Sequence, residues 1–215
     1  MKKELIERIF SSIILIPMIL FFIIKGSFFF IFFILVCFLV TSYEWHMISK
    51  RKSYNFLGFI FLILSFLSAF FLRMNSTDYI HDFILVILIC IATDIGGFVF
   101  GKIFKGPKLT KISPNKTYSG MIGSYFLSII SVFIYVNYYG NYWCMPSCPS
   151  ENKLLIITIL ISSISQIGDL IISYFKRKSK IKNTGKIIPG HGGLLDRIDG
   201  MLFAIPFAFM LFKFL

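Results

Sequence analysis

Residues 176–200 read KRKSKIKNTGKIIPGHGGLLDRIDG, a basic run followed by a glycine–histidine turn and two aspartates that enter an apolar segment. The rest of the 215-residue chain is dominated by apolar residues, since 57% of the chain is hydrophobic and 27 residues are Phe. A chain of this length cannot bury so much apolar surface in a water-soluble core, so lipid must cover it. Because helices satisfy their own backbone hydrogen bonds in lipid, the sequence predicts an all-α polytopic membrane protein that holds the quoted stretch at the membrane surface.

Seven apolar segments have or approach the length of about 20 residues that a helix needs to cross a bilayer. We predict these spans at 9–24, 27–43, 56–72, 80–100, 118–137, 154–174 and 194–213. The first resembles the start of a signal peptide, but no small-residue cleavage site follows it and the next apolar run begins at once, which favours a retained helix. A cytoplasmic N-terminus then places 18 of the 22 Lys and Arg residues in cytoplasmic segments, as the positive-inside rule requires.

The formal net charge of +12 is distributed in short basic runs between the apolar segments. No stretch outside the spans is long enough for a basic soluble domain that holds a duplex, so we expect no nucleic-acid partner. The membrane surface or an anionic ligand explains the charge better. Cys37 and Cys90 lie within apolar runs, where they act as small hydrophobic residues. Cys144 and Cys148 share a predicted outer loop, where a local disulfide and two free thiols are both open.

Four acidic residues lie in the predicted spans, where an ionisable group is costly and indicates a functional site. They are Asp94, Asp169, Asp196 and Asp199. At about 1.5 Å of rise per helical residue, Asp94 and Asp169 lie at similar depths below the basic residues that follow them, and the other two lie one turn apart at the start of the last span. Converging carboxylates repel one another unless a cation is present. Mg²⁺ is the natural ion, because it prefers oxygen ligands from carboxylates and substrate phosphates.

The predicted helix that carries Asp169 has polar residues along one face. Ser162, Gln166, Asp169 and Ser173 follow one another at spacings of four, three and four residues, which is the period of a helical face. For Gln166 and the serines, hydrogen bonds that join helices and a functional role are both open. We favour a functional role for Asp169, because a carboxylate is a costly group with which to join helices.

Two predicted cytoplasmic loops are suited to bind anions. The turn PGHGG at 189–193 has glycines that allow close backbone approach, and it leads into a helix N-terminus whose free N–H groups favour phosphate. The sequence SPNKT at 113–117 offers the hydroxyls and ammonium of Ser113, Lys116 and Thr117 as phosphate contacts. From the residues alone we predict a membrane enzyme that binds phosphates through Mg²⁺ at the cytoplasmic leaflet, with its other substrate in the bilayer.

The C-terminal half of the chain resembles the phosphatidate cytidylyltransferases, or CDP-diacylglycerol synthases. Their signature runs Ser-x-x-Lys-Arg, then Lys-Asp, then Pro-x-His-Gly-Gly-x-x-Asp-Arg-x-Asp. The chain matches it with unbroken spacing at Ser173, Lys176, Arg177, Lys182, Gly185, Pro189, His191, Gly192, Gly193, Asp196, Arg197 and Asp199. Asn183 stands where the family usually has Asp, and the N-terminal spans match only in character and at Glu44–Trp45.

The resemblance implies that a cytidylyl group passes from CTP to phosphatidic acid, giving CDP-diacylglycerol and pyrophosphate for phospholipid synthesis. It implies Mg²⁺ as the cofactor, with Asp169 and Asp196 as the primary ligands. Asp199 and Asp94 would hold a second cation or support the first.

The remaining site residues follow from the same resemblance and from their chemistry. Lys176 and Arg197 are assigned to catalysis with the two primary aspartates, and His191 joins them either as a proton donor or as a residue that orders its loop. Phosphate or substrate binding is assigned to Ser113, Lys116, Thr117, Ser173, Arg177, Lys182, Gly192 and Gly193.

We expect one integral membrane domain over residues 1–215, with N-terminal spans in 1–75 and a catalytic core in 80–215 whose cytoplasmic loops are 101–118 and 175–193. The expected location is a bacterial inner membrane, with the active site facing the cytoplasm. The spacing of Gly97 and Gly101 permits helix packing within one chain or in a homodimer.

Two other functions stay open from the sequence. One is a CTP-dependent enzyme that acts on a prenyl or polyprenol lipid, and the other is a non-enzymatic transporter. The Asp-Gly-x-x-Ala-Arg pattern of the CDP-alcohol phosphotransferases is absent.

Overall fold

The computed structural model describes residues 17–74, 79–110, 113–143, 150–185, 187 and 192–214. Residues 17–25 are helical, and six further helices follow in these ranges. They are α2 (Ser27–Ser49), α3 (Asn55–Met74), α4 (Tyr79–Phe104), α5 (Tyr118–Trp143), α6 (Glu151–Lys178) and α7 (Leu195–Phe214). The predicted all-α class is confirmed for the part of the chain that is described.

Five of these helices, α2 to α6, are long and apolar enough to cross a membrane. They correspond to five of the seven predicted spans, and the chain is an integral membrane protein. Helix α7 coincides with the last predicted span, but Asp196, Arg197, Asp199 and Lys213 make it too polar to be identified as a span by composition. The first predicted span lies mostly outside the described residues, so seven spans and a cytoplasmic N-terminus stay predictions.

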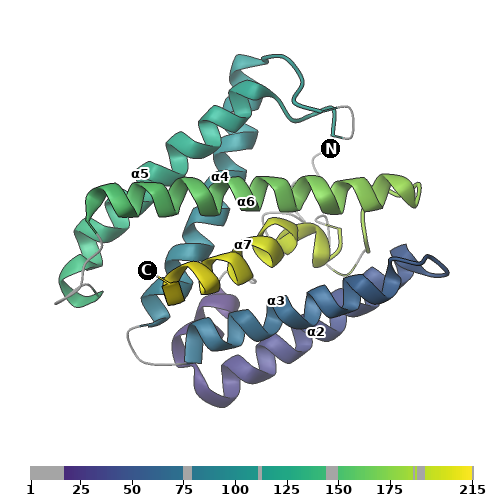
Figure 1. Cartoon of the computed structure of the whole chain (residues 1–215), viewed down its shortest axis with the longest axis horizontal. Coiled ribbons are helices and arrows are strands. Elements are labelled where there is room, and N and C mark those ends of the chain that lie inside the picture. The colour runs from purple at the N-terminus through teal and green to yellow at the C-terminus, as the bar shows by residue number, and fades with distance from the viewer. Residues whose placement is uncertain are drawn as a thin grey trace.

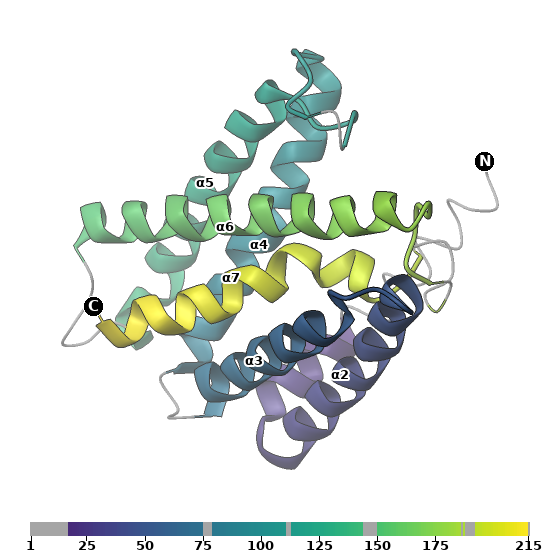
Figure 2. The same cartoon turned by 45° about the vertical axis from the view of Figure 1, so that its right-hand side comes forward.

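The helices pack against one another mainly in pairs, and the pairs contact each other near the centre of the molecule (Figure 1). Helices α4 and α5 form a hairpin, α6 and α7 lie side by side, and α3 contacts both α2 and α7. The turned view in Figure 2 shows the same neighbours, with the α4–α5 loop on the far side of α6 from α2 and α3. Many large apolar side chains, among them Phe28, Phe98 and Phe126, are exposed on the outer faces of the helices, as expected for surfaces that face lipid.

A hydrophobic cluster joins four helices next to the loop that connects α6 and α7. Its buried members are Trp45 and Ile48 of α2, Leu62 of α3, Ile172 of α6, and Leu195 and Leu202 of α7. Leu195 is the first residue of α7, so this cluster fixes the start of that helix against the end of α6. The predicted catalytic stretch is therefore held on both sides by packed helices.

Glycines allow the backbones of α4 and α5 to approach closely. A Cβ atom on Gly96 would collide with the carbonyl oxygen of Gly123, which is a backbone atom that cannot rotate away. Cβ atoms on Gly97 and Gly101 would face Gly120 and its neighbours on α5. The glycine spacing on α4 therefore serves packing within the chain, and the homodimer stays a prediction.

Gly96→Ala is expected to lower thermal stability, because the added methyl group forces α4 and α5 apart. Overpacking of this kind costs about 1–3 kcal/mol. The measurement is the Tm of the protein in detergent. Gly97→Ala is the matched control, since its Cβ would come close only to the hydroxyl of Ser124, at 2.9 Å, and it should lower Tm less. Equal Tm values for the two variants would contradict the close backbone contact.

Candidate functional site

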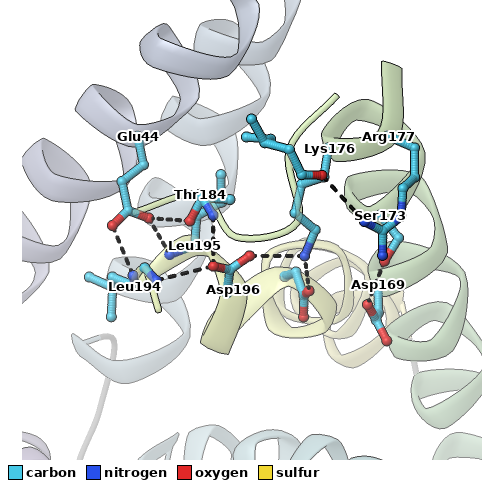
Figure 3. A network of polar contacts seen from close by, with 12 residues as sticks. Glu44, Asp169, Ser173, Lys176, Arg177, Thr184, Leu194, Leu195 and Asp196 are labelled. Carbon is cyan, nitrogen blue, oxygen red and sulfur yellow. Dashed lines mark hydrogen bonds and ion pairs between the residues drawn. The ribbon is translucent and has the colours of Figure 1, made fainter. Parts of the chain in front are cut away.

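The centre of the site is the side chain of Lys176, which lies near the end of α6 and points toward the start of α7 (Figure 3). Its Nζ donates to Asp196 Oδ1 at 2.9 Å and lies 3.6 Å from Asp199 Oδ2. Lys176 is only 8% exposed, and both carboxylates are largely buried. The ammonium lies between two largely buried carboxylates and supplies a positive charge where an unpaired carboxylate would be costly.

Asp196 also holds the loop before α7 in place. Its Oδ2 accepts the N–H of Thr184 at 2.8 Å and the N–H of Gly193 at 3.1 Å. An acidic residue in the first turn of a helix is favourable, because it neutralises the free N–H groups there. Asp196 thus links α6, through Lys176, to the middle of the loop and to its last residues before α7.

A second ion pair connects the α4–α5 loop to α6. Lys116 Nζ pairs with Asp169 Oδ2, and Ser173 donates to Asp169 Oδ1 at 3.3 Å. Lys116 is positioned by a short hairpin in which the N–H of Leu109 donates to the carbonyl of Lys116 at 2.8 Å. The N–H of Lys116 closes the turn on Ser113 at 3.0 Å. This ion pair brings the α4–α5 loop to Asp169 on α6.

The four predicted carboxylates come together, although Asp94 is exposed and Asp169 is only partly buried. Asp94 lies within electrostatic range of Asp169, Lys116 and Arg197. The carboxyl groups of Asp169 and Asp199 are within hydrogen-bonding range of each other. Two carboxyl groups so close require a shared proton or a nearby cation between them. All four predicted acidic residues therefore belong to one network.

This donor set fits Mg²⁺ if phosphate oxygens complete the coordination. In the described part of the chain, no three Asp, Glu, His or Cys side chains form a group that holds a metal by itself. Mg²⁺ commonly binds one or two carboxylates and takes its other ligands from water and substrate phosphates. The carboxylates of this network supply that number of ligands.

Glu44 of α2 is a site residue that the sequence analysis did not select. Its Oε2 accepts from Thr184 Oγ1 at 2.8 Å and from the N–H of Leu195 at 2.8 Å, and its Oε1 accepts from the N–H of Leu194 at 3.0 Å. The predicted span ends at residue 43, whereas α2 continues to Ser49. The match to the family at Glu44–Trp45 was the only signal in the sequence that pointed to this residue.

These contacts correct the prediction for the turn before α7. The N–H groups of Gly193, Leu194 and Leu195 donate to Asp196 and Glu44, so the helix N-terminus is filled by carboxylates of the chain itself. Gly193 does not offer its N–H to a phosphate in this arrangement. His191, with 188–190, lies outside the described residues, so its role stays a prediction.

Other predicted phosphate contacts lie around this network. Arg177 is exposed at the end of α6, Lys182 on the loop that follows, and Arg197 on α7. Thr117 has a structural use, since its hydroxyl accepts the N–H of Gly120 at 3.1 Å and so caps α5. Ser162 and Gln166 hydrogen bond to each other, and Thr93 of α4 donates to Ser162. For Ser162 the structure supports the helix-joining interpretation, whereas the bond of Gln166 lies within α6.

The arrangement brings exposed basic groups to the edge of a buried acidic network. Basic side chains bind phosphates, and clustered carboxylates bind the cation that phosphates carry. Positioned charges of this kind neutralise the charge that develops when a phosphoryl bond is made or broken. The geometry is suited to a reaction between phosphate groups at the end of the helix bundle.

Comparisons with known proteins agree with this chemistry. The model of the cytidylyltransferase family matches residues 52–215. The phosphatidate cytidylyltransferase of Rickettsia typhi is 38% identical over 222 residues, which cover 97% of this chain and 92% of that protein. The enzyme of the same name from Rickettsia felis is 34% identical over 220 residues, or 98% of this chain and 93% of that protein.

Staphylococcal relatives are longer than this chain. The phosphatidate cytidylyltransferase of Staphylococcus aureus (strain COL) is 35% identical over 181 residues, which cover 80% of this chain. The match spans 65% of the length of the staphylococcal protein.

Proposed function

Because the chain belongs to the cytidylyltransferase family, we propose that it transfers a cytidylyl group from CTP to phosphatidic acid and releases pyrophosphate. The observation that carries this proposal is the buried network of Lys176 with Asp196 and Asp199, joined by Asp169 and Lys116. It lies wholly within the residues that match the family. The named relatives from Rickettsia, which cover nearly the whole chain, support phosphatidic acid as the lipid substrate.

The proposed reaction needs alignment and charge neutralisation more than a strong base. A phosphate monoester has a second pKa of about 6, so the phosphatidic acid headgroup is largely ionised at neutral pH. One of its oxygens forms a bond to the α-phosphorus of CTP, and the bond from that phosphorus to the bridging oxygen of the β-phosphate breaks. The electron pair leaves with pyrophosphate. The product is CDP-diacylglycerol, a precursor for phospholipid synthesis.

Mg²⁺ is the proposed cofactor, with a second cation as an open alternative. Asp169 and Asp196 would hold it, supported by Asp199 and Asp94. When bound, Mg²⁺ neutralises phosphate charge and polarises the reacting phosphoryl group. Lys176 and Lys116, which now neutralise the carboxylates, would then contact substrate phosphates.

The exposed basic residues are proposed to bind the charged ends of the two substrates. Arg177, Lys182 and Arg197 surround the network and are exposed. Guanidinium groups bind phosphate oxygens in pairs, whereas an ammonium acts as a point charge. We assign these residues to the triphosphate and the lipid headgroup, with Ser173 and Ser113 as further contacts.

The proposed location is a bacterial inner membrane, with the site open to the cytoplasm, where CTP is made. The bacterial relatives and the five apolar helices support a bacterial membrane. The excess of Lys and Arg in the loops that carry the site supports the cytoplasmic side.

The test is a transfer assay with the purified protein in detergent–lipid micelles. CTP and phosphatidic acid should give a CDP-lipid and pyrophosphate in equal amounts. EDTA should stop the reaction and excess Mg²⁺ should restore it, because the carboxylate network needs the cation. A polyprenyl phosphate in place of phosphatidic acid should give no product. Preference for that lipid would overturn the assigned substrate, and full activity in EDTA would overturn the cofactor.

A further inference from the structure

Glu44 lies at the junction between the N-terminal helices and the proposed active site. It is on α2, outside residues 52–215 that match the family model. Its side chain is only 1% exposed, and Figure 3 shows it facing the start of α7 from the side opposite Lys176. A buried carboxylate is costly unless donors surround it. Its position therefore needs a specific explanation.

The donors around Glu44 explain how its charge is tolerated. The carboxylate accepts three hydrogen bonds, from the hydroxyl of Thr184 and from the N–H groups of Leu194 and Leu195. The two N–H groups belong to the N-terminus of α7, where the helix dipole favours a negative charge. Glu44 is thus bound to the loop that joins α6 and α7 at Thr184, near its middle, and at its junction with α7.

Two glycines of the matched signature make room for this carboxylate. A Cβ atom on Gly185 would lie 2.8 Å from Glu44 Oε1. A Cβ atom on Gly193 would collide with Thr184 Oγ1 and would lie 2.5 Å from Glu44 Oε2. The loop therefore closes around the Glu44 carboxylate at two points, Gly185 and Gly193.

The same end of α2 makes further contacts with the catalytic loop region. Ser179 donates to the carbonyl of Ile48 at 2.7 Å. The rings of Trp45 and Phe175 meet edge to face, with centroids 5.3 Å apart. The end of α2 is consequently docked on the end of α6 as well as on the start of α7.

From these contacts we infer that Glu44 is a positioning residue for the proposed cytidylyl transfer. Its carboxylate fixes Thr184 and the first turn of α7. Thr184 also donates its N–H to Asp196, and the first turn of α7 carries Asp196 itself. When Glu44 is lost, Asp196 and Asp199 no longer meet Lys176 in the required geometry. Helix α2 is then part of the catalytic scaffold. The expected effect on the reaction rate rests on the proposed function, whereas the effect on the structure of the loop does not.

The experiment compares Glu44→Gln with the wild-type protein in two measurements. Glutamine keeps the size of the side chain but replaces one acceptor oxygen by an NH₂ group. That group cannot accept a hydrogen bond from the donors around Glu44. Hydrogen–deuterium exchange of the peptide that contains Leu194 and Leu195 should become faster, because the single oxygen of the amide cannot accept from both N–H groups and one of them loses its acceptor. The value of kcat/KM for CTP per folded molecule should fall about tenfold or more, as for hydrogen bonds to a charged group.

Thr41→Val is the matched control. Thr41 is a fully buried polar residue of α2, and its hydroxyl donates to the carbonyls of Cys37 and Phe38 within the same helix. This variant should leave both the exchange of the α7 peptide and the kinetic constants unchanged. Thr184→Val combined with Glu44→Gln should lose no more activity than Glu44→Gln alone, since both changes break the same contact.

Wild-type exchange at Leu194 and Leu195 in Glu44→Gln would overturn the inference. The inference would also be overturned if total activity fell only because less protein was folded, while kcat and KM per folded molecule stayed at their wild-type values. The exchange measurement needs no activity. A wild-type protein that makes no CDP-lipid would therefore refute the proposed function, while the exchange of the α7 peptide would still decide whether Glu44 holds the loop.

Discussion

Asp196→Asn is expected to abolish CDP-lipid formation. One oxygen of Asp196 accepts from Lys176 and the other accepts two backbone N–H groups, so an amide must turn its NH₂ group toward a donor on one side or the other. The substitution also removes a proposed ligand of Mg²⁺. Breaking one partner of a buried ion pair costs about 3–5 kcal/mol of folding stability. The loss of a positioned charge at the reacting phosphates should in addition lower kcat/KM by at least about 100-fold.

The measurement is kcat/KM for CTP at saturating Mg²⁺, normalised to folded protein. Asp82→Asn is the matched control, because it makes the same chemical change in the first turn of α4, at the end of that helix away from the α4–α5 loop. The control should retain wild-type activity. Full activity in Asp196→Asn would refute the metal model and the role of the Lys176 pair together.

Lys176→Met is expected to cause losses of both stability and activity. Methionine replaces the length of the side chain but not its charge, so Asp196 and Asp199 are left buried without their shared cation. A buried charge without its partner costs about 3–5 kcal/mol, and the carboxylates repel each other in addition. The Tm of the protein in detergent should fall, and no CDP-lipid should form.

A second substitution separates the two effects. In Lys176→Met/Asp199→Asn one of the stranded charges is removed, so Tm should recover in part while transfer remains absent. Lys176→Met with wild-type Tm would contradict the buried ion pairs. Recovery of transfer in the double variant would show that Lys176 balances Asp199 and does not act on substrate phosphates.

Hydropathy alone predicted the helical class and the positions of five spans, because long apolar runs have few alternatives in lipid. Charge at the helix ends predicted the depth of Asp94, Asp169 and Asp199, and these residues do converge. The last helix was predicted as a span although Asp196 and Asp199 enter its first turns. Composition cannot tell how deep such a helix lies when its charges are paired inside the protein.

Contacts between distant segments could not be predicted from one sequence. Glu44 bonds to residues 140 to 151 positions later in the chain, and no local pattern encodes that pairing. The same holds for the ion pair between Lys116 and Asp169. Lys176 was assigned to catalysis from the family resemblance, and its pairing with two carboxylates could not be predicted. A basic residue in a loop sequence does not reveal whether its neighbours in space are acidic.

The most direct test of the central claim follows the phosphate groups of CTP into the products. The purified protein is supplied with phosphatidic acid and with CTP labelled either at the α- or at the γ-phosphate. The account predicts that α-label appears in the chloroform-soluble lipid and γ-label appears only in pyrophosphate, with no transfer in EDTA. γ-Label in the lipid, or no labelled lipid from well-folded protein at saturating Mg²⁺, would contradict it.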